Sequence, residues 1–171
     1  MRNELTENDI KKMEEEIDYR ISVVRKEALE DVKTARAQGD LSENFEYHAA
    51  KKFKNQNESR IRYLQRMIKS ATVIKETAAE DEIGVNNTVE IYYEDDDETE
   101  VIKLVTTVRE DSLLGLISIE SPLGKALLGH KVGDRVLIHV NDSLEYYVVV
   151  KRIDKTDDAD DKIQRYWQQS H

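Results

Sequence analysis

Two long stripes of apolar residues, separated by a short polar segment, constrain the fold of this chain more than any other feature. In the first stripe an apolar residue recurs about every 3.6 positions, which is the period of an α-helix. Both stripes are narrow, so each helix is expected to bury its stripe against a single partner helix. Because few residues separate them, the helices must run antiparallel, and we expect an α-helical hairpin over residues 7–74. The stripes comprise Ile10, Met13, Ile17, Ile21, Val24, Ala28, Val32 and Ala35, then Tyr47, Ala50, Phe53, Asn57, Ile61, Leu64, Ile68 and Ala71.

Three polar or small residues set the limits and the register of this hairpin. Thr6 can cap the first helix, and Gly39 can end it because glycine adopts the left-handed conformation without steric cost. Asn57 falls within the second stripe, where a polar residue lowers stability but can fix the register of two helices. We therefore expect Asn57 in the seam between the helices.

The pattern changes after residue 86, where apolar residues alternate with polar ones and β-branched residues dominate. Five strands are expected, at residues 89–93, 100–105, 115–119, 136–140 and 145–150. A short helix over residues 121–128 lies between the third and fourth strands, with Ser121 as its N-cap and Pro122 at its first position. This arrangement predicts a small antiparallel α+β domain.

The chain is thereby divided into four parts. Residues 1–75 form the hairpin, with its tip at 39–44, and residues 76–86 form a linker. Residues 87–154 form the small domain, and 155–171 an acidic and polar tail that is expected to be loose or partly helical.

Composition excludes several classes of protein and site. The chain has no cysteine, which excludes disulfides and thiolate metal sites. It has no run of 18 apolar residues, so we expect a soluble, cytoplasmic protein without a membrane partner. The acidic runs at 94–98 and 157–161 lack the glycine and final glutamate of a calcium loop, and are interpreted as solvated loops. No nucleotide-binding or hydrolase motif is present, so any chemistry is expected in the hairpin.

Charge is shared unevenly along the chain. Residues 1–75 hold 16 basic and 14 acidic residues, whereas residues 76–171 hold 10 basic and 22 acidic residues. Within 51–75, eight basic residues accompany the single acid Glu58. This basic segment is either a solvated helix face or a surface that guides the hairpin toward nucleic acid or an anionic channel.

The bend of the hairpin also allows two interpretations. Asp40 and Glu43 have the spacing of a capping box, in which both carboxylates satisfy backbone N–H groups at a helix start. The alternative is that the two carboxylates hold a divalent cation at the end of a long rod, since such ions prefer carboxylate oxygens. Two carboxylates alone would bind the ion weakly, so this site would need another macromolecule to complete it.

Family motifs favour the second interpretation. The run Ala-Arg-x-x-Gly-Asp-Leu-Ser-Glu-Asn-x-Glu-Tyr-x-Ala-Ala-Lys at 35–51 resembles the hairpin of the Gre family of bacterial transcript cleavage factors, and its GreA branch in particular. Residues 121–129 and Gly133-Asp134 are similar to the FKBP-like C-terminal domain of that family. The resemblance covers residues 5–153.

The resemblance implies a function that depends on a partner. In this family the hairpin enters the secondary channel of a backtracked RNA polymerase, where two tip acids help to hold Mg²⁺ in the polymerase active site for hydrolysis near the RNA 3′ end. The implied partners are RNA polymerase and the nascent RNA 3′ end. The chain itself would be monomeric, would not be an enzyme on its own and would bind no Mg²⁺ in isolation. The implied residues are Asp40 and Glu43 for catalysis and metal binding, Arg36, Asn44, Lys51 and Lys52 for channel or RNA contacts, and Ser121 and Pro122 for polymerase docking.

Three departures from the family pattern keep alternatives open. Phe45 stands where the family usually has alanine, residues 105–112 replace a family motif, and the chain continues through Tyr166 and Trp167. One alternative is a Gre-like paralogue that occupies the channel without supporting cleavage, although Asp40 and Glu43 are both retained. The other is an FKBP-like prolyl isomerase or chaperone, but no Phe or Trp occurs in the strand domain to line such a pocket.

Overall fold

The computed structural model describes residues 3–39 and 44–164, which divide into two compact units. The sheet unit contains residues 3–7 and 72–164, and the hairpin unit contains residues 8–39 and 44–71. No helix within the described ranges is both long and apolar enough to cross a membrane. The elements are β1 (Asn3–Thr6), α1 (Glu7–Tyr19), η1 (Arg20–Val24), α2 (Arg25–Arg36), α3 (Phe45–Lys69), β2 (Ala71–Ile74), β3 (Thr88–Tyr93), β4 (Glu98–Val105), η2 (Thr107–Arg109), η3 (Ser112–Leu114), β5 (Leu116–Ser118), α4 (Pro122–Leu127), β6 (Arg135–Asn141) and β7 (Leu144–Asp154).

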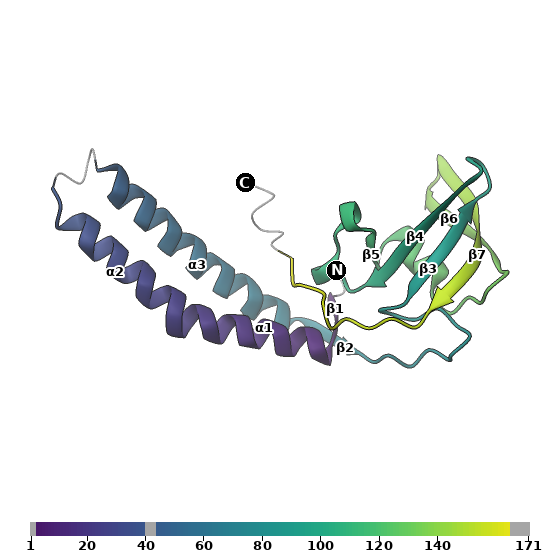
Figure 1. Ribbon diagram of the computed structural model, residues 1–171, viewed down its shortest axis with the longest axis horizontal. Helices are drawn as coiled ribbons and strands as arrows, with labels where there is room; N and C mark the ends of the chain where they lie inside the picture. The colour runs from purple at the N-terminus through teal and green to yellow at the C-terminus, as the bar shows by residue number, and fades with distance from the viewer. Residues whose placement is uncertain (1–2, 40–43, 165–171) are drawn as a thin grey trace. The chain divides into compact units, whose positions relative to one another are not determined.

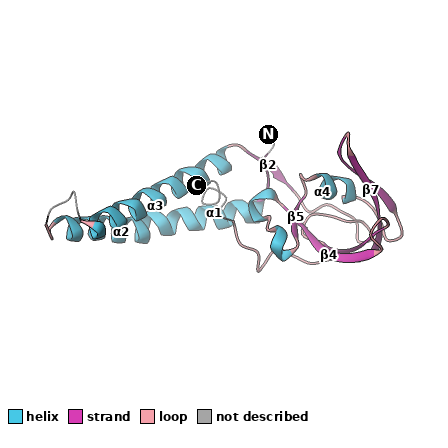
Figure 2. Cartoon of the chain, turned by 90° about the horizontal axis from the view of Figure 1, so that it is seen from above, coloured by secondary structure: helices cyan, strands magenta, loops and turns pink. Residues whose placement is uncertain are grey.

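The hairpin unit confirms the expected pair of antiparallel helices. One arm consists of α1, η1 and α2, the other is α3, and Figures 1 and 2 show α2 running alongside α3. Ala28, Ala35, Ile61 and Leu64 of the predicted stripes are buried. Phe53, which the pattern places in the seam, is instead 43% exposed, so the seam has less apolar cover toward the bend than at the far end.

A π-helical turn interrupts the first arm and shifts its apolar stripe. In η1 the backbone N–H of Arg25 donates to the carbonyl of Arg20, five residues earlier, so this turn holds one residue more than an α-helical turn. Ile21 lies inside it and is 37% exposed rather than in the seam. Asn57 is buried in the seam as predicted, and its amide donates to the Arg20 carbonyl at 3.2 Å. The seam asparagine thus pairs with the irregular turn of the opposite arm, which fixes the register of the two arms.

The prediction that the second helix continues to residue 74 is wrong. α3 ends at Lys69, and Ala71–Ile74 form β2, which pairs with β1 in a two-stranded sheet. The sequence Thr72-Val73-Ile74 is β-branched throughout, and such side chains favour extended backbone. The residues just before the hairpin and just after it are therefore joined as strands in the sheet unit.

The main sheet contains the five expected strands in the order β5-β4-β3-β7-β6. β3 pairs antiparallel with both β4 and β7, and β6 pairs antiparallel with β7. β5 pairs parallel with β4, so the prediction of a wholly antiparallel sheet is wrong at this edge. The chain passes from β4 through η2 and η3 before it enters β5, and this connection returns it in the direction of β4.

The core of the sheet unit lies between the sheet and α4, which packs against β5 and β6. Ser121 caps α4 as predicted, because its Oγ accepts a hydrogen bond from the Gly124 N–H at 3.1 Å. Ile83 and Val85, from the segment expected to be a linker, are also buried in this core. The other buried members are Val89, Ile91, Ile102, Leu104, Ile119, Leu127, Val136, Ile138, Val148 and Val150.

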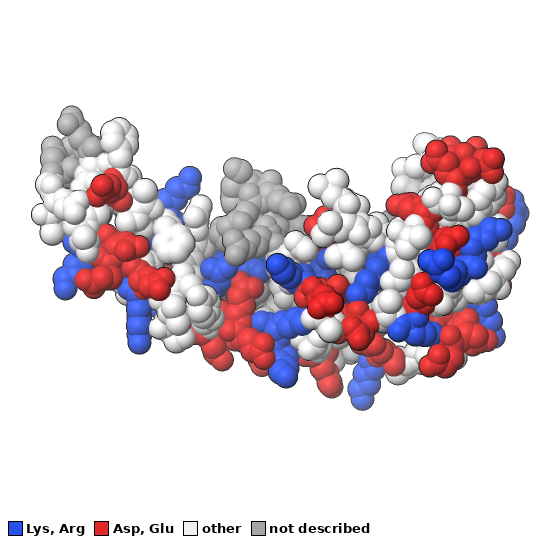
Figure 3. Space-filling view, in the orientation of Figure 1, with Lys and Arg blue, Asp and Glu red and all other residues white. Residues whose placement is uncertain are grey.

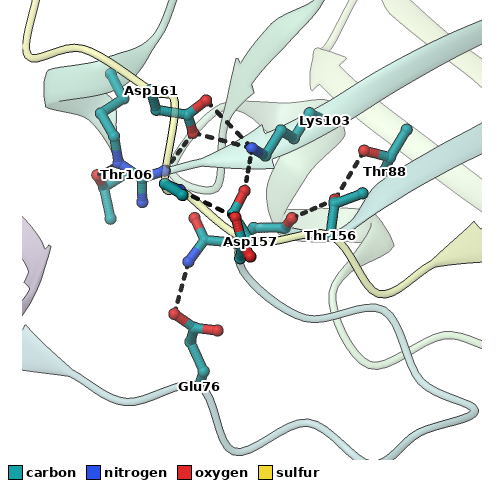
Figure 4. A network of polar contacts seen from close by, with 10 residues as sticks. Glu76, Thr88, Lys103, Thr106, Thr156, Asp157 and Asp161 are labelled. Carbon is teal, nitrogen blue, oxygen red and sulfur yellow. Dashed lines mark hydrogen bonds and ion pairs between the residues drawn. The ribbon is translucent and has the colours of Figure 1, made fainter. Parts of the chain in front are cut away.

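Of the tail expected at 155–171, residues 155–164 are bound along the sheet unit instead of being loose or helical, and the remainder lies outside the described residues. The Lys155 Nζ donates to the carbonyls of Ala79 and Glu82 at 2.7 and 2.5 Å. Asp161 lies between Lys103 and Arg109, with N–O distances of 3.1 and 2.8 Å. Figure 4 shows Asp161 directed at Lys103 and Thr156 directed at Thr88. Polar contacts in place of an apolar stripe explain why the acidic sequence of this segment suggested a solvated tail.

Candidate functional site

The candidate site is the end of the hairpin, between the last residue of α2 and the first of α3. α2 ends at Arg36 and α3 begins at Phe45. Gly39 has a φ of +140°, a backbone conformation that L side chains rarely adopt, consistent with its expected place at the end of the first arm. Asp40 and Glu43, the predicted catalytic and metal-holding residues, lie outside the described residues, and so does the capping box proposed for them.

Asn44 positions the start of the second arm. Its Oδ1 accepts a hydrogen bond from the Tyr47 N–H at 3.0 Å, which caps α3. Its Nδ2 donates to the Ala35 carbonyl at 2.8 Å and so ties α3 to the end of α2. The channel or RNA contact that the sequence predicted for Asn44 stays a prediction, since the amide keeps a second N–H and a second oxygen lone pair beside these two bonds. Asn44 thus holds the two ends of the segment that carries Asp40 and Glu43.

Arg36 and Tyr47 form a pair across the end of the hairpin. The Arg36 guanidinium carbon lies 5.7 Å from the centroid of the Tyr47 ring. A hydrogen bond from Arg36, together with the positive charges of Lys51 and Lys54, lowers the pKa of the Tyr47 hydroxyl despite the opposing effect of desolvation. This end of α3 is therefore electropositive, as an anion-facing surface would be.

Most basic residues in the α3 part of the segment are at least partly exposed to solvent. Lys51 and Lys52 are both exposed, and neither has an ion pair within the part of the chain that the structure describes. The single acid of the segment, Glu58, is turned toward α2, where it pairs with Arg25 through contacts of 3.1 and 2.9 Å. The positive charge of Lys51 and Lys52 is thus left unneutralised along one side of the hairpin.

Arg60 departs from the expected basic surface, because it is fully buried. Its guanidinium donates to both carboxylate oxygens of Glu16, at 2.8 and 3.1 Å. Arg20 adds a contact of 2.7 Å to Glu16 and one of 3.1 Å to Asn57. Burial alone would raise the pKa of Glu16, but the hydrogen bonds and charges of Arg60 and Arg20 together lower it. The sequence analysis missed this network because it counted Arg60 with the exposed basic residues of the segment 51–75. Its neighbour Ile61, which belongs to the apolar stripe, was the available sign that Arg60 lies close to the seam.

Two further features carry exposed groups. Phe45, noted in the sequence as unusual at this position, is 88% exposed at the first position of α3. In the sheet unit, Pro122 is exposed at the start of α4 and Ser121 is half-buried and occupied as its cap. The predicted docking residues therefore form one surface turn. Within the described residues no group of three or more His, Asp or Glu side chains is arranged to hold a metal ion.

Comparisons with known proteins identify both units. A family model described as "Transcription elongation factor, N-terminal" matches residues 3–73. A second, "Transcription elongation factor, GreA/GreB, C-term", matches residues 78–155. Transcription elongation factor GreA of Thermoanaerobacter pseudethanolicus is 44% identical over 137 residues, which cover 80% of this chain and 87% of that protein. The GreA of Bacillus licheniformis is 42% identical over 135 residues, covering 78% and 85% of the two chains.

Solved structures are also similar, with lower identity. The crystal structure of GreA factor homolog 1 (Gfh1) of Thermus thermophilus is 25% identical, with a TM-score of 0.42, and covers 90% of this chain and 99% of that one. The family models and the GreA relatives confirm the resemblance read from the tip motif and the α4 motif, and they support none of the alternative functions. With both units matched over nearly their whole length, the chain belongs to the GreA/GreB family of transcription elongation factors.

Proposed function

We propose that this chain is a transcript cleavage factor that inserts the end of its hairpin into RNA polymerase and stimulates hydrolysis of backtracked RNA near its 3′ end. The observation that carries the proposal is the hairpin itself, in which α2 ends at Arg36 and α3 begins at Phe45 and runs back antiparallel to it. The arm from Glu7 to Arg36 spans about 45 Å at 1.5 Å per residue. An element of this length can carry side chains deep into a channel.

The donor set at the bend fits a hard divalent cation. Asp40 and Glu43 supply carboxylate oxygens, the ligands that Mg²⁺ prefers, and one or two protein carboxylates commonly suffice when a partner or substrate completes the shell. When bound, the ion stabilises negative charge on the oxygens of the phosphodiester. The isolated chain would supply only these two ligands, so the polymerase would supply the rest. The nuclease activity would therefore be that of the polymerase.

The described part of the hairpin supports this role. Asn44 fixes the distance between the arms where the acidic segment leaves and returns. Lys51 and Lys52 place positive charge next to it, which attracts an RNA strand or an acidic channel wall. On the sheet unit, the exposed turn at Pro122 would contact the rim of the channel. The factor would act as a monomer in the cytoplasm, where the polymerase is.

The test uses a stalled, backtracked polymerase complex with RNA labelled along its length, in the presence of Mg²⁺. The unmodified chain should release short 3′ fragments. Asp40→Asn and Glu43→Gln should each abolish release, because an amide is a poorer ligand for Mg²⁺ than a carboxylate. A matched control removes the same kind of charge from the body of the hairpin, with Glu30→Gln and Asp31→Asn at exposed positions of α2, and it should cleave normally.

Binding to the polymerase, measured in parallel by fluorescence anisotropy, separates the possible outcomes. Loss of cleavage with retained binding in the tip variants supports the proposal. Cleavage that survives Asp40→Asn and Glu43→Gln contradicts the metal-holding role. An unmodified chain that binds without ever releasing fragments would instead be a modulator of transcription that occupies the channel.

A further inference from the structure

A cavity opens at the end of the sheet where the β3–β4 and β6–β7 hairpins turn. Its volume is about 290 Å³, which is at the lower end of the range for ligand pockets. Figure 3 shows acidic side chains gathered over this end of the sheet unit, where Figure 1 places the two hairpin turns. The cavity is lined by Tyr93, Asp95, Asp96, Leu144, Tyr146 and Tyr147.

Two tyrosines give the cavity an aromatic wall held in place by the core. The rings of Tyr93 and Tyr146 are tilted toward each other with centroids 5.9 Å apart, and both pack against the hydrophobic core. The Tyr93 hydroxyl donates to Glu100 at 2.6 Å. Burial, this hydrogen bond and the nearby negative charges of Glu100 and Asp96 all raise the pKa of Tyr93. The tyrosines therefore stay neutral, and their surroundings are strongly electronegative.

An acidic turn of fixed shape also lines the cavity. The turn at 94–97 is anchored at both ends, since the Glu94 N–H donates to the Tyr147 carbonyl at 3.3 Å and Asp97 accepts from the Tyr92 hydroxyl at 2.6 Å. Asp95 and Asp96, at its apex, are exposed. Neither has an ion pair or side-chain hydrogen bond within the described residues. Two carboxylates without an ion pair therefore line the same cavity as the aromatic wall.

The same turn already holds a guanidinium group from this chain. Arg135 lies over the Tyr147 ring, with its guanidinium carbon 3.5 Å from the ring centroid. Its Nε and Nη2 donate to the two carboxylate oxygens of Glu94 at 2.8 and 2.9 Å. An acid of the turn and a neighbouring tyrosine thus hold an arginine side chain between them by a bidentate ion pair and a cation–π contact. Asp95, Asp96 and the Tyr93–Tyr146 pair repeat this combination without a resident cation.

We propose that this cavity is a binding site for an arginine side chain presented by a basic segment of a partner protein. Charge complementarity selects the occupant: a planar guanidinium can stack on a tyrosine ring while it donates to two carboxylates, and a phosphate group would be repelled by the same acids. The site lies in the sheet unit and uses none of the residues proposed for cleavage. It is independent of the proposed function and gives the acidic run at 94–98, interpreted above as a solvated loop, a specific role.

The test is an NMR titration of the full ¹⁵N-labelled chain with a short acetylated glycine–arginine–glycine amide peptide. The amide signals of residues 95, 96, 146 and 147 should shift in a saturable manner. A peptide in which citrulline replaces arginine has the same shape without the charge, and it should cause no saturable shift. Binding should also weaken as salt is raised, because exposed charges are screened beyond about 10 Å at 0.1 M salt.

Variants locate the site. Asp95→Asn combined with Asp96→Asn should weaken peptide binding about tenfold, since the two substitutions remove both ion pairs that the guanidinium would form with the turn. A control variant, Glu80→Gln with Asp160→Asn, removes the same charge from exposed positions that do not line the cavity, and it should bind as the unmodified chain does.

Three results would overturn the proposal. One is equal binding of the citrulline peptide, which would show that charge does not select the ligand. The second is equal weakening in both double variants, which would indicate attraction by net charge alone. The third is the same shifts on raising protein concentration without peptide, which would mean that a second copy of the chain fills the cavity.

Discussion

The buried ion pair in the hairpin gives a quantitative prediction for Glu16. The side chain of Arg60 is 1% exposed and that of Glu16 is 25% exposed, so only the arginine of the pair is shielded from solvent. Glu16→Gln keeps the shape of the side chain but leaves the guanidinium buried without its carboxylate. Breaking a fully buried pair in this way costs about 3–5 kcal/mol. Because Glu16 retains some solvent, we expect the lower end, about 3 kcal/mol lost from the free energy of unfolding of the hairpin.

Urea unfolding followed by helical circular dichroism measures this loss, since α1, α2 and α3 hold most of the helix in the described chain. A second variant, Glu16→Leu with Arg60→Met, removes both charges and fills the space with apolar groups. Its stability should return to within about 1 kcal/mol of the unmodified chain, because the desolvation cost of the pair disappears with the pair. The single and double variants together separate the loss of a partner from the loss of packing.

A loss of less than about 1 kcal/mol in Glu16→Gln, the value typical of a surface pair, would contradict this prediction. So would a double variant that is less stable than the single one. Either result would mean that Arg60 is solvated in solution despite its place in the seam.

Three further predictions follow from single residues. Because the pKa of Glu16 is lowered below 4.5 in the folded chain, the stability that it adds should be complete above that pH and decline as pH falls through the lowered value; Glu16→Gln should lack this acid dependence in urea unfolding at several pH values. Gly124→Ala should destabilise the sheet unit by about 3 kcal/mol or more in thermal unfolding, since its Cβ would lie 2.0 Å from the Ser118 carbonyl oxygen, and a normal melting temperature would contradict this contact. Asn44→Ala should cost the hairpin about 1–2 kcal/mol in urea unfolding through loss of the α3 cap and of the bond to Ala35, while Asn44→Asp, which keeps the capping oxygen, should recover part of it.

The parts of the fold that could be predicted are those set by local periodicity. The two arms, the five strands and the Ser121 cap of α4 follow from apolar spacing and from capping chemistry, and each lies within a few residues of its expected bounds. The strand at Ala71–Ile74 was missed because its pairing partner, Asn3–Thr6, lies more than 60 residues away in sequence. The β-branched run at 72–74 was the local sign of a strand, and the helical stripe that reaches Ala71 obscured it.

The sequence predicted which residue types make up the candidate site, but not the hydrogen-bond or ion-pair partner of each side chain. The tip motif indicated Asn44 as a contact for the partner and gave no sign that its amide also bonds to Tyr47 and Ala35. The charge count placed Arg60 on the surface, whereas it is buried against Glu16. Both differences arise because residue type and spacing do not reveal which side chain across the hairpin supplies a partner.

The contacts along the hairpin predict that its two ends differ in stability. Near the far end the seam is apolar, with Ile61 and Leu64 buried, whereas toward the bend Phe53 is exposed. There the arms are joined instead by the Arg25–Glu58 pair and by Asn44. Exposed and half-exposed polar links each contribute little and weaken with salt, so the end of the hairpin should open at lower free energy than its base. Under the proposed function, such opening of the arms would let Asp40 and Glu43 adjust to the ligands that a polymerase supplies.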